Sequence, residues 1–178
     1  RVLKIAKAMC DAGTAMTVMG NHEYNAVCYH TKQRQGERYL RKHKDERSIE
    51  NKQTWLQFND HMDEWGKWIE WFRTLPLYLK LDGLNIIHAC WDSDAIKEIS
   101  IDHGSQPLMN DDFLHASAVK NSALYHQVET LLKGKEVSLP GGIVMQDKDG
   151  KQRREVRTRW WLDEHELARH DNCLHLCL

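Results

Sequence analysis

The sequence predicts a mixed α/β fold in a single domain that covers residues 1–178. Near the start, a helical pattern passes through a short loop into an apolar run, as in layered α/β proteins. Further along, two Asp-Gly pairs each separate extended runs, which is a strong hairpin signal. With 41% hydrophobic and 29% charged residues and only 3 Pro, the composition is that of a chain with a packed core.

The first elements are predicted from the spacing of apolar side chains. Residues 2–9 repeat apolar side chains at helical intervals, and Asp11 and Gly13 are expected to end that helix. Residues 14–19 form an apolar run rich in Thr, Val and Met, which predicts a buried strand that stops at Gly20. A second helix is expected after Glu23.

The middle of the chain divides into a polar segment and an aromatic helix. Residues 32–54 are strongly polar, with acidic residues that offset the basic ones, so we expect an exposed helical or mobile insertion. Residues 55–73 predict a helix that ends before Pro76. One face of this helix carries large apolar side chains, which indicates core packing: Trp65, Trp68, Ile69 and Phe72.

Later elements are predicted from turn signals. Asp82-Gly83 joins two strand-like runs into a hairpin, and the second run, "LNIIHACWD", is apolar enough for a central strand. Residues 110–133 predict one or two helices, with Gly134 as the C-cap. Asp149-Gly150 predicts a second hairpin.

Charge and cysteine content restrict the classes of partner and compartment. The net charge is −1, so electrostatics give no argument for a nucleic-acid or membrane partner. No apolar run is long enough to span a membrane. The five cysteines form no Cys-x-x-Cys pair and are odd in number, so we expect reduced thiols and a cytoplasmic location.

Polar side chains follow two of the predicted strands directly. Asn21, His22 and Glu23 come after the first, and His88 follows the apolar part of a later one. Because sites in α/β sheets form at the carboxyl ends of strands, we expect Asn21 and His88 to converge. An amide oxygen and a neutral imidazole are suitable ligands for a divalent ion. His22 could hold a proton for a leaving group, because imidazole exchanges protons near neutral pH.

These residues resemble the calcineurin-like metallophosphoesterases. The similarity lies in "VMGNHEYNAVCYHT", in "RTLPLYLKLDGLNIIHACWD" and in the late "DKDGKQRREVRTRWW", and it covers most of the chain. It is greatest to the bacterial branch near diadenosine tetraphosphatases and serine/threonine protein phosphatases. The resemblance implies a partial four-layer β-sandwich flanked by helices.

The resemblance also implies a role for each matching residue. Asn21 and His88 would bind one of two divalent metals (Mn, Fe, Zn or Ni), His22 would protonate the leaving oxygen, and Glu23 would support the geometry of the motif. Hydrolysis of a phosphate ester or anhydride would proceed by attack of a metal-bridging hydroxide. The substrate would be a phosphorylated small molecule, a dinucleoside polyphosphate or a phosphoprotein. We also expect Arg157 or Arg159 to contact it.

The chain departs from the family pattern at three motifs. The early Asp-x-His and Gly-Asp-x-x-Asp-Arg-Gly motifs are absent, and so is a late Gly-His. We therefore expect a fragment, truncated at both ends, that lacks the first strand units. Two ligands for one metal bind an ion weakly, so we expect the isolated chain to be inactive.

Two alternatives come from other residues, and both describe a non-catalytic binding module. The tail could bind zinc through four soft ligands, although their spacing is tight for a chelate: His170, Cys173, His175 and Cys177. A basic and aromatic run could instead bind single-stranded nucleic acid, although Glu155 interrupts its basic face: Arg153, Arg154, Arg157, Arg159, Trp160 and Trp161.

Overall fold

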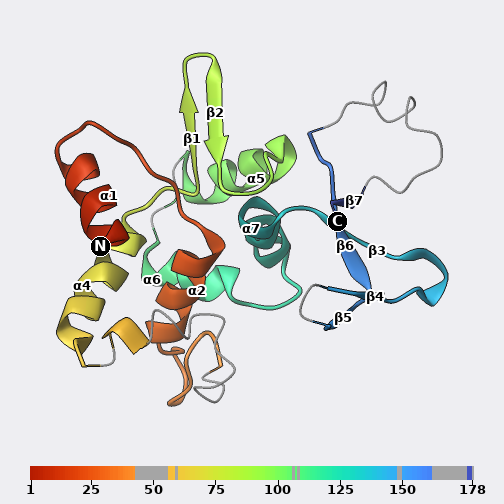
Figure 1. The fold of residues 1–178 in the computed structure, drawn as a ribbon, viewed down its shortest axis with the longest axis horizontal. Coiled ribbons are helices and arrows are strands. Elements are labelled where there is room, and N and C mark those ends of the chain that lie inside the picture. Colours follow the sequence, from red (N-terminus) through yellow and green to blue (C-terminus); the bar gives the residue numbers. More distant parts are fainter. Residues whose placement is uncertain are drawn as a thin grey trace.

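The computed structural model describes residues 1–42, 56–58, 60–105, 107, 109–147, 150–161 and 176–177. Helices and small antiparallel sheets are combined in it, which confirms the mixed α/β class (Figure 1). The helices are α1 (Val2–Asp11), α2 (Asn21–His30), α4 (Met62–Arg73), α5 (Ser93–His103), α6 (Asp111–Ser117), α7 (Ala123–Lys133) and the 3-10 turn η2 (Pro140–Gly142). The strands are β1 (Tyr78–Leu81), β2 (Leu84–Ile87), β3 (Glu136–Ser138), β4 (Met145–Gln146), β5 (Gln152–Arg153), β6 (Glu155–Thr158) and β7 (Leu176–Cys177).

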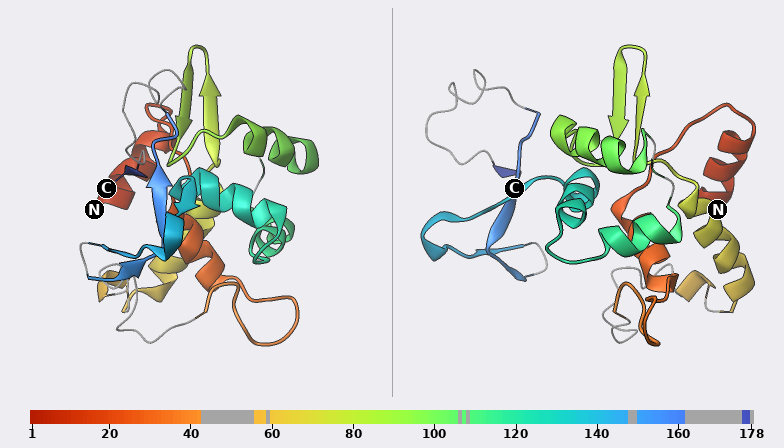
Figure 2. Two further views of the ribbon diagram at one scale, coloured as in Figure 1. Left: turned by 90° about the vertical axis from the view of Figure 1, so that its right-hand side faces the viewer. Right: turned by 180° about the vertical axis from the view of Figure 1, so that it is seen from behind.

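The core lies among the helices. Helix α2 packs against α4 and α7, and α7 also packs against α5 and α6 (Figures 1 and 2). Buried apolar side chains come from all of these helices and from the segment before β1. The most completely buried are Met19, Val27, Leu77, Ile99, Leu114, Val128, Leu131 and Leu132. The helical body therefore has a well-developed core.

The N-terminal helix is confirmed, but the strand predicted at residues 14–19 is wrong. Helix α1 ends at Asp11, and Gly13 follows it at a φ of 68°. Residues 15–20 belong to no helix and no strand. Met19 is fully buried, and its backbone N–H donates to Pro76 O at 2.7 Å, whereas Met16 is 64% exposed. The end of the apolar run is therefore buried beside the chain before β1, without sheet pairing.

The polar segment and the aromatic helix are each partly as predicted. Residues 32–42 form no helix; a single bridge pairs Lys32 with Tyr39. Residues 43–55 of the predicted insertion lie outside the described residues. Helix α4 starts at Met62, later than predicted, and ends at Arg73. It buries Trp68, Ile69 and Phe72 as expected, with Trp65 half-buried beside them.

The first hairpin is confirmed, but the prediction of a central strand is wrong. Strands β1 and β2 pair antiparallel with Leu81 opposite Leu84, and Gly83 has the positive φ (69°) that the turn requires. Within the described residues this sheet has two strands only, and it projects from the helical body (Figure 1). Leu84 is 55% exposed, so apolarity alone was a poor guide to strand position.

The helices after the hairpin are held by side-chain caps. Residues 110–133 divide into α6 and α7, and Gly134 is the C-cap of α7 at a φ of 96°, both as predicted. Asn110 and Ser122 accept backbone N–H bonds at the two N-termini. Helix α5 was not predicted; Asp92 caps it by accepting from the Ala95 N–H at 3.0 Å.

The C-terminal strands form a thin layer beside α7 (Figures 1 and 2). Strand β6 lies between β3 and β7, and β4 pairs with β5 as the second predicted hairpin. Gly150 has a φ of 74° in that turn, while Asp149 lies outside the described residues. In the described part of this layer, few side chains are buried, namely Leu139 and Val156.

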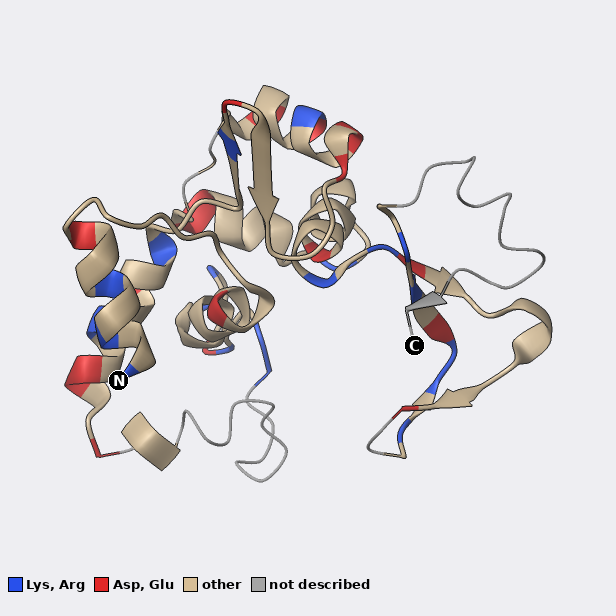
Figure 3. Cartoon of the chain, turned by 45° about the horizontal axis from the view of Figure 1, so that its top comes forward, with Lys and Arg blue, Asp and Glu red and all other residues tan. Residues whose placement is uncertain are grey.

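The described helices include none long and apolar enough to cross a membrane. Basic and acidic residues alternate over the surface of the helices and of the C-terminal strands, in keeping with the balanced net charge (Figure 3). Among the described residues, Cys10, Cys28 and Cys90 are free thiols. The tail residues His170, Cys173 and His175 of the zinc alternative lie outside the described residues.

Candidate functional site

The motif residues lie in the first turn of α2. Gly20 is the N-cap with extended backbone angles (φ −102°, ψ 167°), and its carbonyl accepts the Tyr24 N–H at 3.0 Å. Asn21, His22 and Glu23 are thus the first three helical residues, where the sequence predicted a loop after a strand. The helix is anchored by its other face, which buries Tyr24 and Val27.

His88 is held by the short segment between β2 and α5. It follows Ile87, the last residue of β2, and the next residue is tied to α7 because the Ala89 N–H donates to Leu131 O at 3.2 Å. His88, Cys90 and Asp92 follow β2, and two of them have structural roles. Cys90 is buried, which raises the pKa of its thiol, and Asp92 caps α5. Only His88 is exposed toward the site.

Asn21 and His88 converge, 67 positions apart in sequence. Their atoms Asn21 Oδ1 and His88 Nε2 lie 3.1 Å apart, a normal hydrogen-bond length. The expected convergence is therefore present in the structure, although it joins a helix N-terminus to a hairpin end rather than two neighbouring strands of one sheet. The role of either residue as a metal ligand remains a prediction.

Gly20 leaves room for two side chains of the site. A Cβ added there would collide with Glu23 Oε2 and would lie 3.2 Å from His88 Cε1. Glu23 and His88 therefore approach the same bare stretch of backbone. A side chain at position 20 would shift the end of the flexible Glu23 side chain and press lightly on the His88 ring.

The pair lies in the wall of a pocket of about 580 Å³. Four described parts of the chain line it: the start of α2, the residues after β2, the end of α7, and the end of β6 with the turn after it. The lining residues are Asn21, His22, His88, Ala89, Leu132, Lys133, Gly134, Arg157, Thr158, Trp160 and Trp161. The pocket thus joins the motif residues to the late basic and aromatic segment.

Two contacts fix the end of β6 beside α7. The Thr158 N–H donates to Lys135 O at 2.8 Å. A Cβ on Gly134 would lie 3.7 Å from Arg157 Cδ, so the stem of Arg157 passes over bare backbone. Of the two arginines predicted to contact substrate, Arg157 lines the pocket, whereas Arg159 is exposed and is not among the lining residues.

The two cations of the pocket are paired to different degrees. Lys133 contacts Glu129, but Arg41 binds the same carboxylate at 2.9 Å, so two cations share one negative charge and Lys133 is only partly neutralised. Arg157 faces Glu136 across the β3–β6 pair with Nε 3.8 Å from the carboxylate, and its side chain is 55% exposed. Such a long, solvated ion pair is weak, so Arg157 is the more weakly paired of the two cations among the described lining residues.

The atoms of Asn21 and His88 fit a metal ion as a pair. Two neighbouring ligands of an octahedral ion with bonds of about 2.1 Å lie about 3.0 Å apart, close to the observed 3.1 Å. Binding an ion would replace their hydrogen bond and would need an unprotonated Nε2 on His88. Among the described residues, no group of three or more His, Cys, Asp or Glu side chains could hold a metal. The described chain thus supplies part of a coordination shell.

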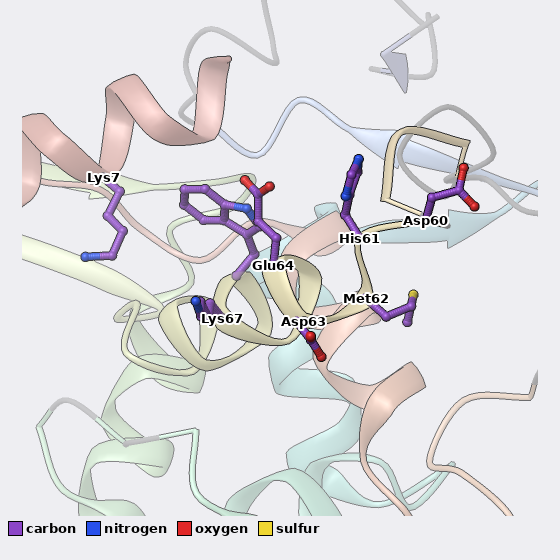
Figure 4. A pocket seen from close by; sticks show the side chains of 8 residues that line it. Lys7, Asp60, His61, Met62, Asp63, Glu64 and Lys67 are labelled. Carbon is purple, nitrogen blue, oxygen red and sulfur yellow. The ribbon is translucent and has the colours of Figure 1, made fainter.

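A second pocket, of about 800 Å³, lies between α1 and α4 (Figure 4). It is lined by Lys7, Asp60, His61, Met62, Asp63, Glu64, Lys67 and Trp68. Lys7 is paired with Asp11, and Glu64 with Lys4 at 3.0 Å. Asp60, His61 and Met62 project in different directions in Figure 4. With mixed charges and no convergent polar groups, this pocket is a weaker candidate than the one at Asn21 and His88.

Comparison of the chain with protein-family models, with curated proteins and with solved structures gave no match. The assignment of a function therefore depends on the residues of the pocket itself. Lys133 and Gly134 were missed as pocket residues by sequence reasoning. A C-cap glycine preceded by lysine is common, so nothing in the sequence marked these two residues as part of a site.

Proposed function

We propose that the chain contributes to metal-dependent hydrolysis of a phosphate ester or anhydride. The observation that carries the proposal is the 3.1 Å approach of Asn21 Oδ1 to His88 Nε2, with His22 and Arg157 in the same pocket. An oxygen and a nitrogen ligand, an exchangeable proton and a weakly paired guanidinium are the groups that phosphoryl transfer uses. This agrees with the resemblance to calcineurin-like metallophosphoesterases.

Each residue has a distinct task in this proposal. Asn21 and His88 would hold a divalent ion such as Mn²⁺, which when bound supplies positive charge and activates water. His22, in the first turn of α2 beside Asn21, would donate a proton to the leaving oxygen. Arg157 would bind the phosphate oxygens, for which its planar guanidinium is well shaped. Glu23, packed against Gly20 close to the His88 ring, would keep the ring in place.

We also propose a fold family, a second metal and a cellular location. We infer that the described elements are part of the four-layer sandwich of these enzymes, that a second metal completes the centre, and that the protein works in the cytoplasm. Phosphorylated small molecules, dinucleoside polyphosphates and phosphoproteins are all candidate substrates. Among the described residues that line the pocket, two are cationic and none is acidic, which favours an anionic ligand.

Titration with Mn²⁺, followed by electron paramagnetic resonance, tests the metal site without relying on activity. We expect one weak site, and at least a tenfold loss of affinity in Asn21→Ala and in His88→Ala, because each variant removes a ligand. His126→Ala is the matched control, since His126 is an exposed histidine on α7 outside the lining of the pocket. Unchanged Mn²⁺ binding in both ligand variants would refute the proposal.

Hydrolysis of p-nitrophenyl phosphate with Mn²⁺ tests the role of His22. The assay is made on this chain, for which we expect little activity because its described residues supply only part of a coordination shell, and on any form of the protein that shows hydrolysis. In the active form, His22→Ala should lower kcat about 100-fold or more with Mn²⁺ affinity unchanged. Equal rates for His22→Ala and the unmodified protein would remove His22 from the mechanism.

A further inference from the structure

The pocket has an aromatic wall that the hydrolytic mechanism does not use. Trp160 and Trp161 follow β6, line the pocket, and are 36% and 55% exposed. Tryptophan is among the side chains most often buried on average, because its large ring gains much from leaving water. Two adjacent tryptophans that line a pocket and remain partly exposed are therefore suited to bind a ligand that would cover them.

The two indoles form a corner. Their ring centroids lie 5.8 Å apart and their planes meet at 89°, an edge-to-face arrangement. A planar ring could stack on one indole and touch the edge of the other. Aliphatic groups would gain area from this wall, but they would not gain the stacking that a flat π-system obtains.

The charged side chains of the pocket indicate what group the ligand carries beside its ring. Among the described residues that line the pocket, the charged ones are both basic, Lys133 and Arg157, and Lys133 shares the Glu129 carboxylate with Arg41. Arg157 lies near the end of β6, three residues before Trp160, and its described ion-pair partner, the Glu136 carboxylate, is 3.8 Å away. A ligand that carries a phosphate near a flat ring would satisfy the guanidinium and the indole corner together.

We propose that Trp160 and Trp161 bind a planar ring attached to the phosphate held by Arg157, so that the pocket selects aryl or nucleoside phosphates over aliphatic ones. This inference deepens the proposed function and rests on it for the catalytic meaning of the site. Binding itself needs only the pocket's own side chains. It also places the ring on the β6 side of the pocket and the phosphate between that ring and the α2 side, where Asn21 and His88 lie.

The experiment measures binding by calorimetry in the presence of EDTA, so that it does not depend on a metal. The probes are adenosine 5′-monophosphate, phenyl phosphate, ribose 5-phosphate and an eight-residue oligothymidylate. We expect the first two to bind about tenfold or more tighter than ribose 5-phosphate, in line with stacking worth about 1–3 kcal/mol per ring. A difference between adenosine 5′-monophosphate and phenyl phosphate would identify the source of the ring, nucleoside or aryl.

Three variants separate the two halves of the pocket. The double variant Trp160→Ala/Trp161→Ala should abolish the preference for ring-bearing probes and leave ribose 5-phosphate binding unchanged, whereas Trp160→Phe/Trp161→Phe should retain most of the preference. Arg157→Gln should weaken all three phosphates. Trp71→Phe, in α4 against Trp68 and Phe72, is the matched control for loss of an indole elsewhere.

Defined outcomes would overturn the inference. Equal affinity for adenosine 5′-monophosphate, phenyl phosphate and ribose 5-phosphate, or no binding of any of them, would show that the indoles do not select a ring. Much tighter binding of the oligothymidylate, with steep salt dependence, would instead favour a nucleic-acid groove. The Mn²⁺ titration of Asn21 and His88 variants decides the hydrolytic proposal separately, so a failure of one is not a failure of the other.

Discussion

The helical body and the C-terminal strand layer contribute to the same pocket but are built differently. The body positions Asn21 and His88 by helices that bury fully covered side chains such as Val27 and Leu131. The strand layer carries Arg157 and the indoles with two buried side chains in its described part, Leu139 and Val156. Because burial of apolar area dominates stability, the two walls of the pocket should differ in resistance to perturbation.

This difference suggests a division of labour. Metal ligands need positions fixed to within a fraction of an ångström, and a packed helix N-terminus supplies that precision. A wall that recognises the rest of a substrate can tolerate more movement, and thinly packed segments commonly carry such roles. The passage of Arg157 over Gly134 brings the layer against the C-cap of α7, and the hydrogen bond from Thr158 to Lys135 extends the β3–β6 pairing beside it.

The largest expected effect comes from removing core volume in the body. Leu131→Ala should lower the free energy of unfolding by about 2–5 kcal/mol, because Leu131 is fully buried and leaves a cavity. Val156→Ala in β6 should cost about 1–2 kcal/mol, since it deletes two methyl groups at a side chain that is 9% exposed. Urea unfolding monitored by circular dichroism gives both values.

Leu84→Ala is the control, because it removes the same atoms at a side chain that is 55% exposed. It should lower the free energy of unfolding by well under 1 kcal/mol. Hydrogen exchange sharpens the comparison: amides of β3 and β6 should exchange at lower opening free energy than those of α7. A Val156→Ala cost equal to that of Leu131→Ala would show that the strand layer is as firmly packed as the body.

The sequence predicted the elements that local patterns encode better than those that depend on distant contacts. Local patterns predicted three helices that the structure contains. Helical spacing marks residues 2–11 and 62–73, and Gly134 marks the end of α7. Asp82-Gly83 acts locally too, and the hairpin is present. A strand at 14–19 needed a distant partner; the run forms no strand, and Met19 instead makes a single backbone hydrogen bond to Pro76.

Sequence patterns predicted only those residues of the site that directly follow an apolar run. Gly20, Asn21 and His22 were found because three polar or special residues follow an apolar run directly, and His88 because it ends another. Lys133 enters the pocket through the packing of α7 beside the β2 exit, where Ala89 meets Leu131. Such a contact is set by tertiary packing, which no local pattern encodes.

A smaller effect should appear in the pH dependence of stability, and it again concerns the body. Burial raises the pKa of the Cys28 thiol to about 11, while the thiol of the unfolded chain ionises near pH 9. The folded state therefore holds a proton that the unfolded state has lost, and stability falls as pH rises from about 9 toward 11. The slope for one such group is at most about 1.4 kcal/mol per pH unit.

Unfolding in urea at pH 8, 9 and 10 measures this slope. Cys28→Ala should flatten the decline between pH 8 and 10, whatever it costs in absolute stability. Tyr24, whose pKa burial also raises, should extend the decline above pH 10 in both proteins. Parallel curves for Cys28→Ala and the unmodified chain would contradict the burial argument.

The smallest effect should come from a surface ion pair of the body. Asp111 lies in the first turn of α6 and accepts from Arg73 Nη2 at 2.5 Å, and this contact lowers the pKa of the carboxyl group. Its stabilisation is present above the ordinary aspartate pKa and is lost as pH falls through the lower folded value. With Asp111 65% exposed, Asp111→Asn should cost less than about 1 kcal/mol.

Asp94→Asn is the control that distinguishes the effect of the ion pair from the effect of a charge at a helix N-terminus. It occupies the first turn of α5, and the described part of the structure gives it no ion pair, so Asp94→Asn removes only the favourable charge at a helix N-terminus. Comparing the two variants by urea unfolding in 0.1 M and 1 M NaCl isolates the contribution of Arg73, because salt screens exposed charges. Equal losses in the two variants at low salt would mean that the helix position alone accounts for Asp111. A larger loss for Asp111→Asn that disappears at high salt would assign the difference to Arg73.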